Sequence, residues 1–101
     1  MPEMTFTVQW PDGTVENCYS PSLVMHDHLE VGAAYALGEF LERAYGALDI
    51  ASERVRAKYG FECTSAMAQK ERLAISSARF APSAAVKVLD MQPALPEAPH
   101  S

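Results

Sequence analysis

Residues 4–19 have the sequence MTFTVQWPDGTVENCY, and this stretch decides the start of the fold. Large apolar residues alternate with polar ones from Met4 to Trp10, a period of two that predicts a strand with one apolar face. The PDG sequence that follows predicts a turn, because proline presets the φ of a type I turn and glycine accepts a positive φ. Val15 to Tyr19 is then the return strand of a hairpin.

The register of this hairpin depends on the kind of turn, and the sequence leaves it open. A two-residue Asp-Gly turn would place Val15 and Tyr19 on the same face as Phe6. A bulged turn would place Cys18 on that face instead. Both turns are compatible with the residues at positions 11–14.

The segment 20–36 is ambiguous in a different way. Ser20-Pro21-Ser22 has the hydroxyl cap and the proline at the first helical position that are typical of a helix start. The residues from Val24 to Leu29 fit a short strand equally well. Gly32 ends the short helix or strand under either interpretation, so the sequence predicts only a connector over 20–36.

A long helix is predicted from Gly38 until Gly60, which is the expected C-terminal stop. Gly46 lies within it at a cost of about 1 kcal/mol relative to alanine, and we expect it to mark a close approach of a neighbouring element. Apolar residues spaced at three and four positions predict the face toward the core: Leu41, Ala44, Leu48, Ala51, Val55 and Tyr59.

A second helix and a third strand complete the predicted fold. The helix begins at a Thr64 or Ser65 cap and runs to about Arg79. Pro82 prevents its continuation, and 84–89 is a strand with alternating valines. The helix residues expected on the apolar side are Met67, Ala74 and Ala78, flanked by Leu73 and Ile75.

This order of elements predicts the α+β class: a β-hairpin, a connector, two helices and a final strand, with the helices packed on one face of a small sheet. The length of 101 residues fits one domain. We expect that domain to span 1–91 and a disordered, Pro-rich tail to span 92–101.

Charge is distributed unevenly along the chain, whose net charge is −5. Residues 1–42 contain seven acidic residues and no Lys or Arg, whereas 43–101 contain six acidic and eight basic residues. This balance argues against binding to nucleic acid or to an anionic membrane, which requires clustered Lys and Arg. The start of the chain lacks the pattern of an export signal, and two cysteines are too few for a disulfide framework, so a cytoplasmic location is expected.

Four residues have the chemistry of metal ligands: Cys18, His26, His28 and Cys63. Their spacing does not match a zinc finger or ribbon, which has two close pairs of ligands, so buried thiols and a polar connector are the simpler interpretation. Cys63 also precedes a predicted helix start, which favours a thiolate, but no base accompanies it. We therefore expect no cofactor and no catalytic residue.

One pair of basic residues is a weaker candidate for interaction. Arg54 and Lys58 lie one helical turn apart and could bind a small anion or a partner, although a solvated helix face also explains them. The sequence contains no Gly-rich phosphate loop, no nucleophile elbow and no acidic calcium loop.

Several segments resemble a known family. They are TFTVQWPDGTVENCYSPS at 5–22, Tyr35-Ala36-Leu37 and ALDIASERVRAKYGFECTSA at 47–66. Together they closely resemble a small family of bacterial nitrogen-starvation-response proteins over about residues 3–89. Members of that family are typically encoded beside a nitrilase-superfamily enzyme, a radical SAM protein and an acetyltransferase. The resemblance therefore implies an accessory role in using a nitrogen source such as a nitrile or cyanide.

Two functional hypotheses follow. The first is an accessory, non-enzymatic cytosolic protein that acts through association, as a homo-oligomer or with a co-encoded enzyme. The exposed edges of a small sheet and an Ala-rich core both favour association. The second is a metal- or thiol-dependent small-molecule binder or enzyme that uses Cys18, His26, His28 and Cys63.

Overall fold

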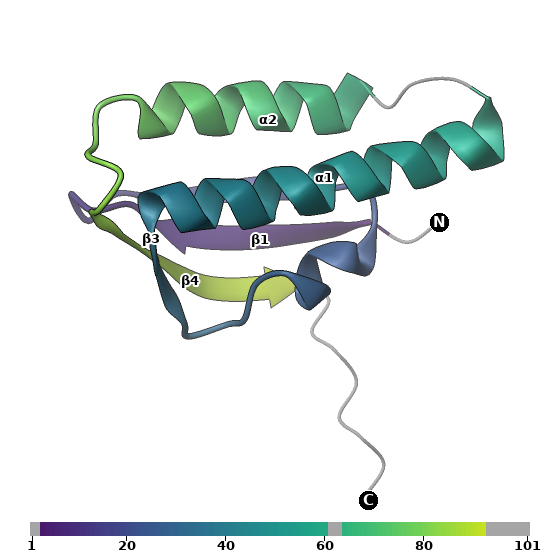
Figure 1. Ribbon diagram of the computed structural model, residues 1–101. Helices are drawn as coiled ribbons and strands as arrows, with labels where there is room; N and C mark the ends of the chain where they lie inside the picture. The colour runs from purple at the N-terminus through teal and green to yellow at the C-terminus, as the bar shows by residue number, and fades with distance from the viewer. Residues whose placement is uncertain (1–2, 61–63, 93–101) are drawn as a thin grey trace, which may run out of the picture.

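The computed structural model describes residues 3–60 and 64–92, in which two helices cover one face of an antiparallel sheet (Figure 1). In chain order the elements are β1 (Met4–Gln9), β2 (Val15–Ser20), the 3₁₀ helix η1 (Leu23–Asp27), β3 (Ala34–Ala36), α1 (Leu37–Tyr59), α2 (Thr64–Ser77) and β4 (Ala85–Gln92). The strand order is β2-β1-β4-β3. The predicted α+β class is confirmed.

The hairpin adopts the bulged turn. Phe6 pairs with Cys18, so both side chains lie on the helix-covered face. The backbone of Trp10 accepts from the N–H of Gly13 at 2.8 Å and donates to the carbonyl of Thr14 at 2.8 Å, which closes a loop of residues 11–13. Gly13 has a φ of +92°, and glycine adopts such a conformation at little cost.

The ambiguous segment 20–36 forms η1 and a short strand, not a strand at 24–29. Ser22 caps η1, since its Oγ accepts a hydrogen bond from the N–H of Val24 at 3.3 Å. β3 then pairs antiparallel with β4, with Tyr35 opposite Val86. This fourth strand was not predicted, because three residues are too short to show an alternating pattern.

Helix α1 begins one residue before the predicted start and has no side-chain cap. The loop before β4 replaces the cap: the carbonyls of Ala84 and Pro82 accept from the N–H groups of Leu37 and Gly38 at 2.8 and 3.0 Å. The predicted stop is confirmed, because Gly60 has a φ of +78° and its N–H donates to the carbonyl of Arg56.

Two details of the α1 prediction are wrong. Tyr59 is half exposed, and the core side of the helix is filled by Phe40 and Ala47 in addition to the predicted Ala44, Leu48 and Ala51. Gly46 marks no close approach, since an added Cβ would meet nothing within 4 Å.

β4 lies between β1 and β3 and is longer than the predicted strand at 84–89. Gln92, which we assigned to the tail, is its last residue. The remainder of the predicted tail lies outside the described residues. The side chains of β4 on the buried face are Val86, Val88 and Met91. A bulge opposite Thr7 and Val8 shifts the alternation of buried and exposed side chains along β4 by one residue.

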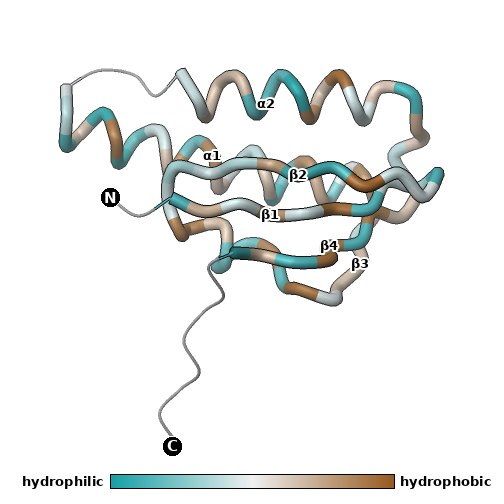
Figure 2. Tube along the Cα trace, turned by 180° about the vertical axis from the view of Figure 1, so that it is seen from behind, coloured by the Kyte–Doolittle hydropathy of each residue, from teal (hydrophilic) through white to brown (hydrophobic). Residues whose placement is uncertain are grey.

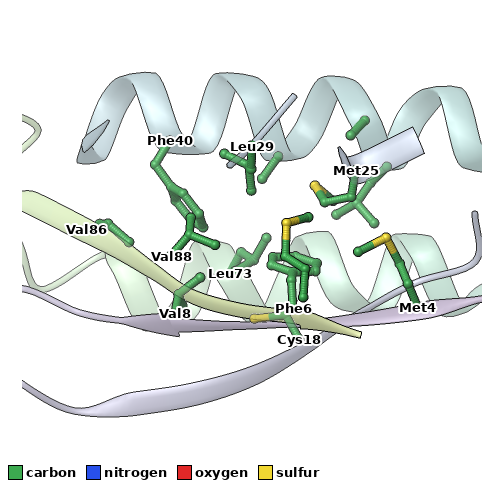
Figure 3. Close-up of a cluster of buried hydrophobic side chains, with 14 of the residues drawn as sticks. Met4, Phe6, Val8, Cys18, Met25, Leu29, Phe40, Leu73, Val86 and Val88 are labelled. Atoms are coloured by element: carbon green, nitrogen blue, oxygen red, sulfur yellow. The ribbon is translucent and has the colours of Figure 1, made fainter. Parts of the chain in front are cut away.

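The core lies between the sheet and the two helices (Figure 3). Phe40 and Phe80 both contact Trp10, the former edge-on at 5.8 Å between ring centroids and the latter stacked at 6.1 Å. Both arrangements are favourable for aromatic rings. Trp10 therefore joins the hairpin to α1 and to the loop after α2.

Candidate functional site

A pocket of about 340 Å³ lies where η1, the following loop, β3 and α1 meet. Polar and charged side chains form most of its wall. The lining residues are His26, Asp27, His28, Leu29, Glu30, Ala33, Tyr35 and Arg43. The pocket therefore brings together both histidines that the sequence singled out.

Arg43 organises this pocket. Its Nη1 donates to the carbonyl of His28 at 3.1 Å, and its Nε and Nη2 contact Glu39 Oε2 at 2.9 and 2.8 Å. The guanidinium also lies over the Tyr35 ring, 5.2 Å from the centroid, while the Tyr35 hydroxyl accepts from the N–H of Glu30 at 3.0 Å. Arg43 thus holds the loop and β3 against α1.

Sequence reasoning did not single out Arg43, because the carbonyl that it binds lies 15 residues away. A weak local signal was present: Glu39 and Arg43 are four residues apart, the spacing of an ion pair on a helix surface. That spacing is common on helix surfaces and does not indicate a pocket.

The two histidines are half buried. His28 Nδ1 lies 3.2 Å from the carbonyl oxygen of Val24, so a tautomer that donates from Nδ1 leaves Nε2 as an acceptor. Such an imidazole nitrogen can accept from a ligand or bind a metal. The structure places His26 and His28 on one pocket but does not test their role as ligands.

Cys18 lies apart from them in the core, where Figure 3 shows it beside Phe6. Its side chain is only 2% exposed. Burial, with a smaller contribution from the Glu16 carboxylate, raises the pKa of Cys18 to about 12, whereas Arg72 lowers it slightly. The thiol is therefore protonated at neutral pH and is a poor ligand or nucleophile.

The predicted ligand set is only partly covered by the structure. Within residues 3–60 and 64–92, no three His, Cys, Asp or Glu side chains are grouped as a metal site requires. Cys63 lies outside these ranges. The set of Cys18, His26, His28 and Cys63 therefore stays a prediction.

The basic pair predicted for interaction lies on the C-terminal half of α1, and both residues are exposed. Arg54 Nη1 donates to Ser22 Oγ at 3.3 Å, and Lys58 Nζ lies 5.6 Å from the centre of the Tyr59 ring. Both contacts are within the protein. Binding by these residues stays a prediction.

Helix α2 faces the core with a different side from the one predicted. Its buried residues are Ala66, Gln69, Leu73 and Ser77. Met67 and Ile75 are 54% and 69% exposed, and Ala74 is also exposed. Figure 2 shows hydrophilic (teal) and hydrophobic (tan to brown) stretches alternating along α2.

Polar contacts to the hairpin fix this orientation of α2. Gln69 Oε1 accepts from the N–H of Tyr19 at 2.9 Å. Glu16 Oε1 accepts from Ser76 Oγ at 2.7 Å and from Trp10 Nε1 at 3.0 Å. These contacts turn Gln69 and Ser76 toward β2, on the side of the buried Leu73, and leave Met67 and Ile75 on the exposed side.

A family model described as nitrogen starvation-induced protein NitG matches residues 5–91. The chain belongs to the NitG family. The resemblance to nitrogen-starvation-response proteins is thereby confirmed. No curated protein and no solved structure matches this NitG-family chain. Among its described residues, no helix is both long and apolar enough to cross a membrane.

Proposed function

We propose that this NitG-family protein is a cytoplasmic, accessory component of the response to nitrogen starvation that acts by binding another protein chain. On this proposal it assists the use of a nitrogen source such as a nitrile or cyanide and performs no chemistry of its own. Membership of the family supports the link to nitrogen starvation.

One observation supports association in particular: the outer face of α2, which consists of Thr64, Met67, Ala68, Glu71, Ala74 and Ile75, is exposed throughout. Met67 and Ile75 are the only large apolar side chains of α2 besides the buried Leu73. Exposed apolar side chains gathered on one helix face are typical of a surface that another chain covers.

The test is to replace the gene with genes for variants of this protein and to measure growth under nitrogen limitation. We expect Ile75→Glu and Met67→Glu to impair growth on a nitrile as the nitrogen source, because a charge on this face opposes burial by a partner. Val31→Glu is the matched control, since Val31 is 54% exposed but lies in the loop before β3. Normal growth of both α2 variants, with normal protein levels, would refute the proposal.

A second candidate function is favoured by the pocket that His26 and His28 share. There the protein would bind a metal ion or a small polar molecule through imidazole nitrogens. The test is a titration of the full chain with Zn²⁺, followed by NMR of the imidazole protons. Saturable binding with one equivalent that is lost in His28→Ala supports this function, and the absence of saturable shifts excludes it for zinc.

A further inference from the structure

The outer face of α2 has an internal symmetry about Glu71. Met67 and Ile75 lie four residues before and after it, and Ala68 and Ala74 lie three residues before and after it. Residues three and four apart share one side of a helix, so these five residues form one face, with Glu71 at its centre. All five are exposed.

This symmetry has a direct consequence for two antiparallel copies of α2. A two-fold axis through Glu71, perpendicular to both helices, brings Ile75 of one copy against Ala68 of the second copy. The same axis brings Met67 against Ala74 of the second copy. Each large side chain therefore meets a small one, which allows the two helices to approach closely.

The charges on α2 are compatible with the same axis. The two Glu71 carboxylates meet there, and Lys70 and Arg72 lie on either side of each. Lys70 is held at the rim by Asp49, at 2.6 Å, and by the Tyr45 ring, at 5.6 Å from its centroid. Since Lys70 is already paired with Asp49, the Arg72 guanidinium of each copy is the cation that flanks the paired carboxylates and partly offsets their repulsion.

We propose that the outer face of α2 binds a second copy of this chain in an isologous, antiparallel helix pair. Isologous interfaces require a surface that is complementary to itself under a two-fold rotation, and the spacing about Glu71 has this property. An unrelated partner would impose no such symmetry. This inference rests on the proposed function in that it names the chain bound by the same face.

The contact is confined to one helix of 14 residues, about 21 Å long. Interfaces of that size are small, so we expect a reversible dimer with a dissociation constant on the order of micromolar. Analytical ultracentrifugation of the full chain over a range of concentrations measures it.

The first set of variants tests the face. Ile75→Glu is expected to raise the dissociation constant by about 30-fold or more, as for a large apolar residue buried in an interface. Glu71→Lys is also expected to raise it, because only cations would then surround the axis. Val31→Glu should match the wild type. A monomer at all accessible concentrations, or a dimer that Ile75→Glu does not weaken, would overturn the proposal.

The second variant tests the axis itself. In a Cys63→Ser background, Glu71→Cys places a thiol on the two-fold axis, where it meets its own copy. We expect rapid formation of a disulfide-linked dimer on mild oxidation, whereas Val31→Cys in the same background should form little disulfide-linked dimer. Equal crosslinking of the two variants would overturn the proposed axis.

These results are separable from those on the proposed function. A monomeric wild type whose Ile75→Glu variant still impairs growth would overturn the dimer and leave the accessory role standing. A dimer that Ile75→Glu dissociates without any effect on growth would support the dimer and refute the accessory role of this face.

Discussion

Gln69 on α2 accepts a hydrogen bond from the backbone N–H of Tyr19 on β2, with 2.9 Å between Oε1 and N. β2 is an edge strand, and this N–H points away from its neighbour β1. The side chain thus takes the place that another strand would occupy at this residue. It also sets the rotation of α2 about its axis, which leaves Met67 and Ile75 on the surface.

Replacement of Gln69 by alanine is expected to lower the free energy of unfolding by about 1–3 kcal/mol, because the half-buried N–H of Tyr19 loses its acceptor. Urea denaturation measures the change. Gln92→Ala is the control, since Gln92 is exposed and its side chain bonds only to Asp90 among the contacts described, while its backbone pairing with Thr5 is kept in the variant. Equal stability of the two variants would show that Gln69 makes no net contribution to stability, since its removal also removes the buried Nε2, for which the structure shows no hydrogen-bond partner among the described residues.

The orientation of α2 predicts opposite outcomes for two of its apolar residues. Leu73→Ala should destabilise the monomer by about 2–5 kcal/mol, because Leu73 is fully buried. Ile75→Ala should change the stability by less than about 0.5 kcal/mol, because Ile75 is exposed. Thermal unfolding at low protein concentration, where association is minimal, distinguishes them. A larger loss for Ile75 would mean that the helix is turned the other way.

Local patterns were sufficient to predict the two strands of the hairpin and the extent of α1. The alternation from Met4 to Trp10 and the left-handed Gly60 depend on neighbouring residues alone. The face of α2 was not predictable in this way, because Met67 and Ile75 are more apolar than Gln69 and Ser77. The contacts that decide it, Tyr19 to Gln69 and Glu16 to Ser76, join residues 50 and 60 positions apart.

The candidate site residues were likewise predictable only in part from the sequence. His26 and His28 were found by residue type, and they do share a pocket. Cys18 was grouped with them by type as well, but the bulged turn places it opposite Phe6 in the core. The sequence had left that register open, so the position of the thiol was open too.

The burial of Cys18 has a consequence at high pH. Its pKa is raised from 9.0 to about 12 in the folded protein, so between these values the unfolded chain loses its thiol proton first. The contribution of the protonated, buried Cys18 thiol to the stability of the folded protein is complete below pH 9 and is lost as the pH rises toward 12. We expect the unfolding free energy of a Cys63→Ser protein to fall more steeply over this range than that of the same protein with Cys18→Ala.

Thiol labelling checks the same point independently. In the Cys63→Ser background at pH 8, Cys18 should react with an aromatic disulfide reagent only when the protein unfolds. Fast labelling of the folded protein would contradict the burial of this residue.

Two glycines are expected to respond to alanine in opposite directions. Gly46→Ala should stabilise the protein by about 0.5–1 kcal/mol, because the site is helical and an added Cβ meets nothing within 4 Å. Gly13→Ala should destabilise it by about 1–2 kcal/mol, because the φ of +92° disfavours a side chain. Chemical denaturation of both variants measures the difference. Destabilisation by Gly46→Ala would indicate a contact that the monomer lacks.

The position of β4 between β1 and β3 affects the order in which the chain can fold. During synthesis β1, β2, β3 and both helices are translated before β4. Until it arrives, β1 and β3 have no strand between them, and the apolar side of the hairpin has only part of its cover. The nascent protein therefore completes its sheet in one late step, by insertion of a central strand.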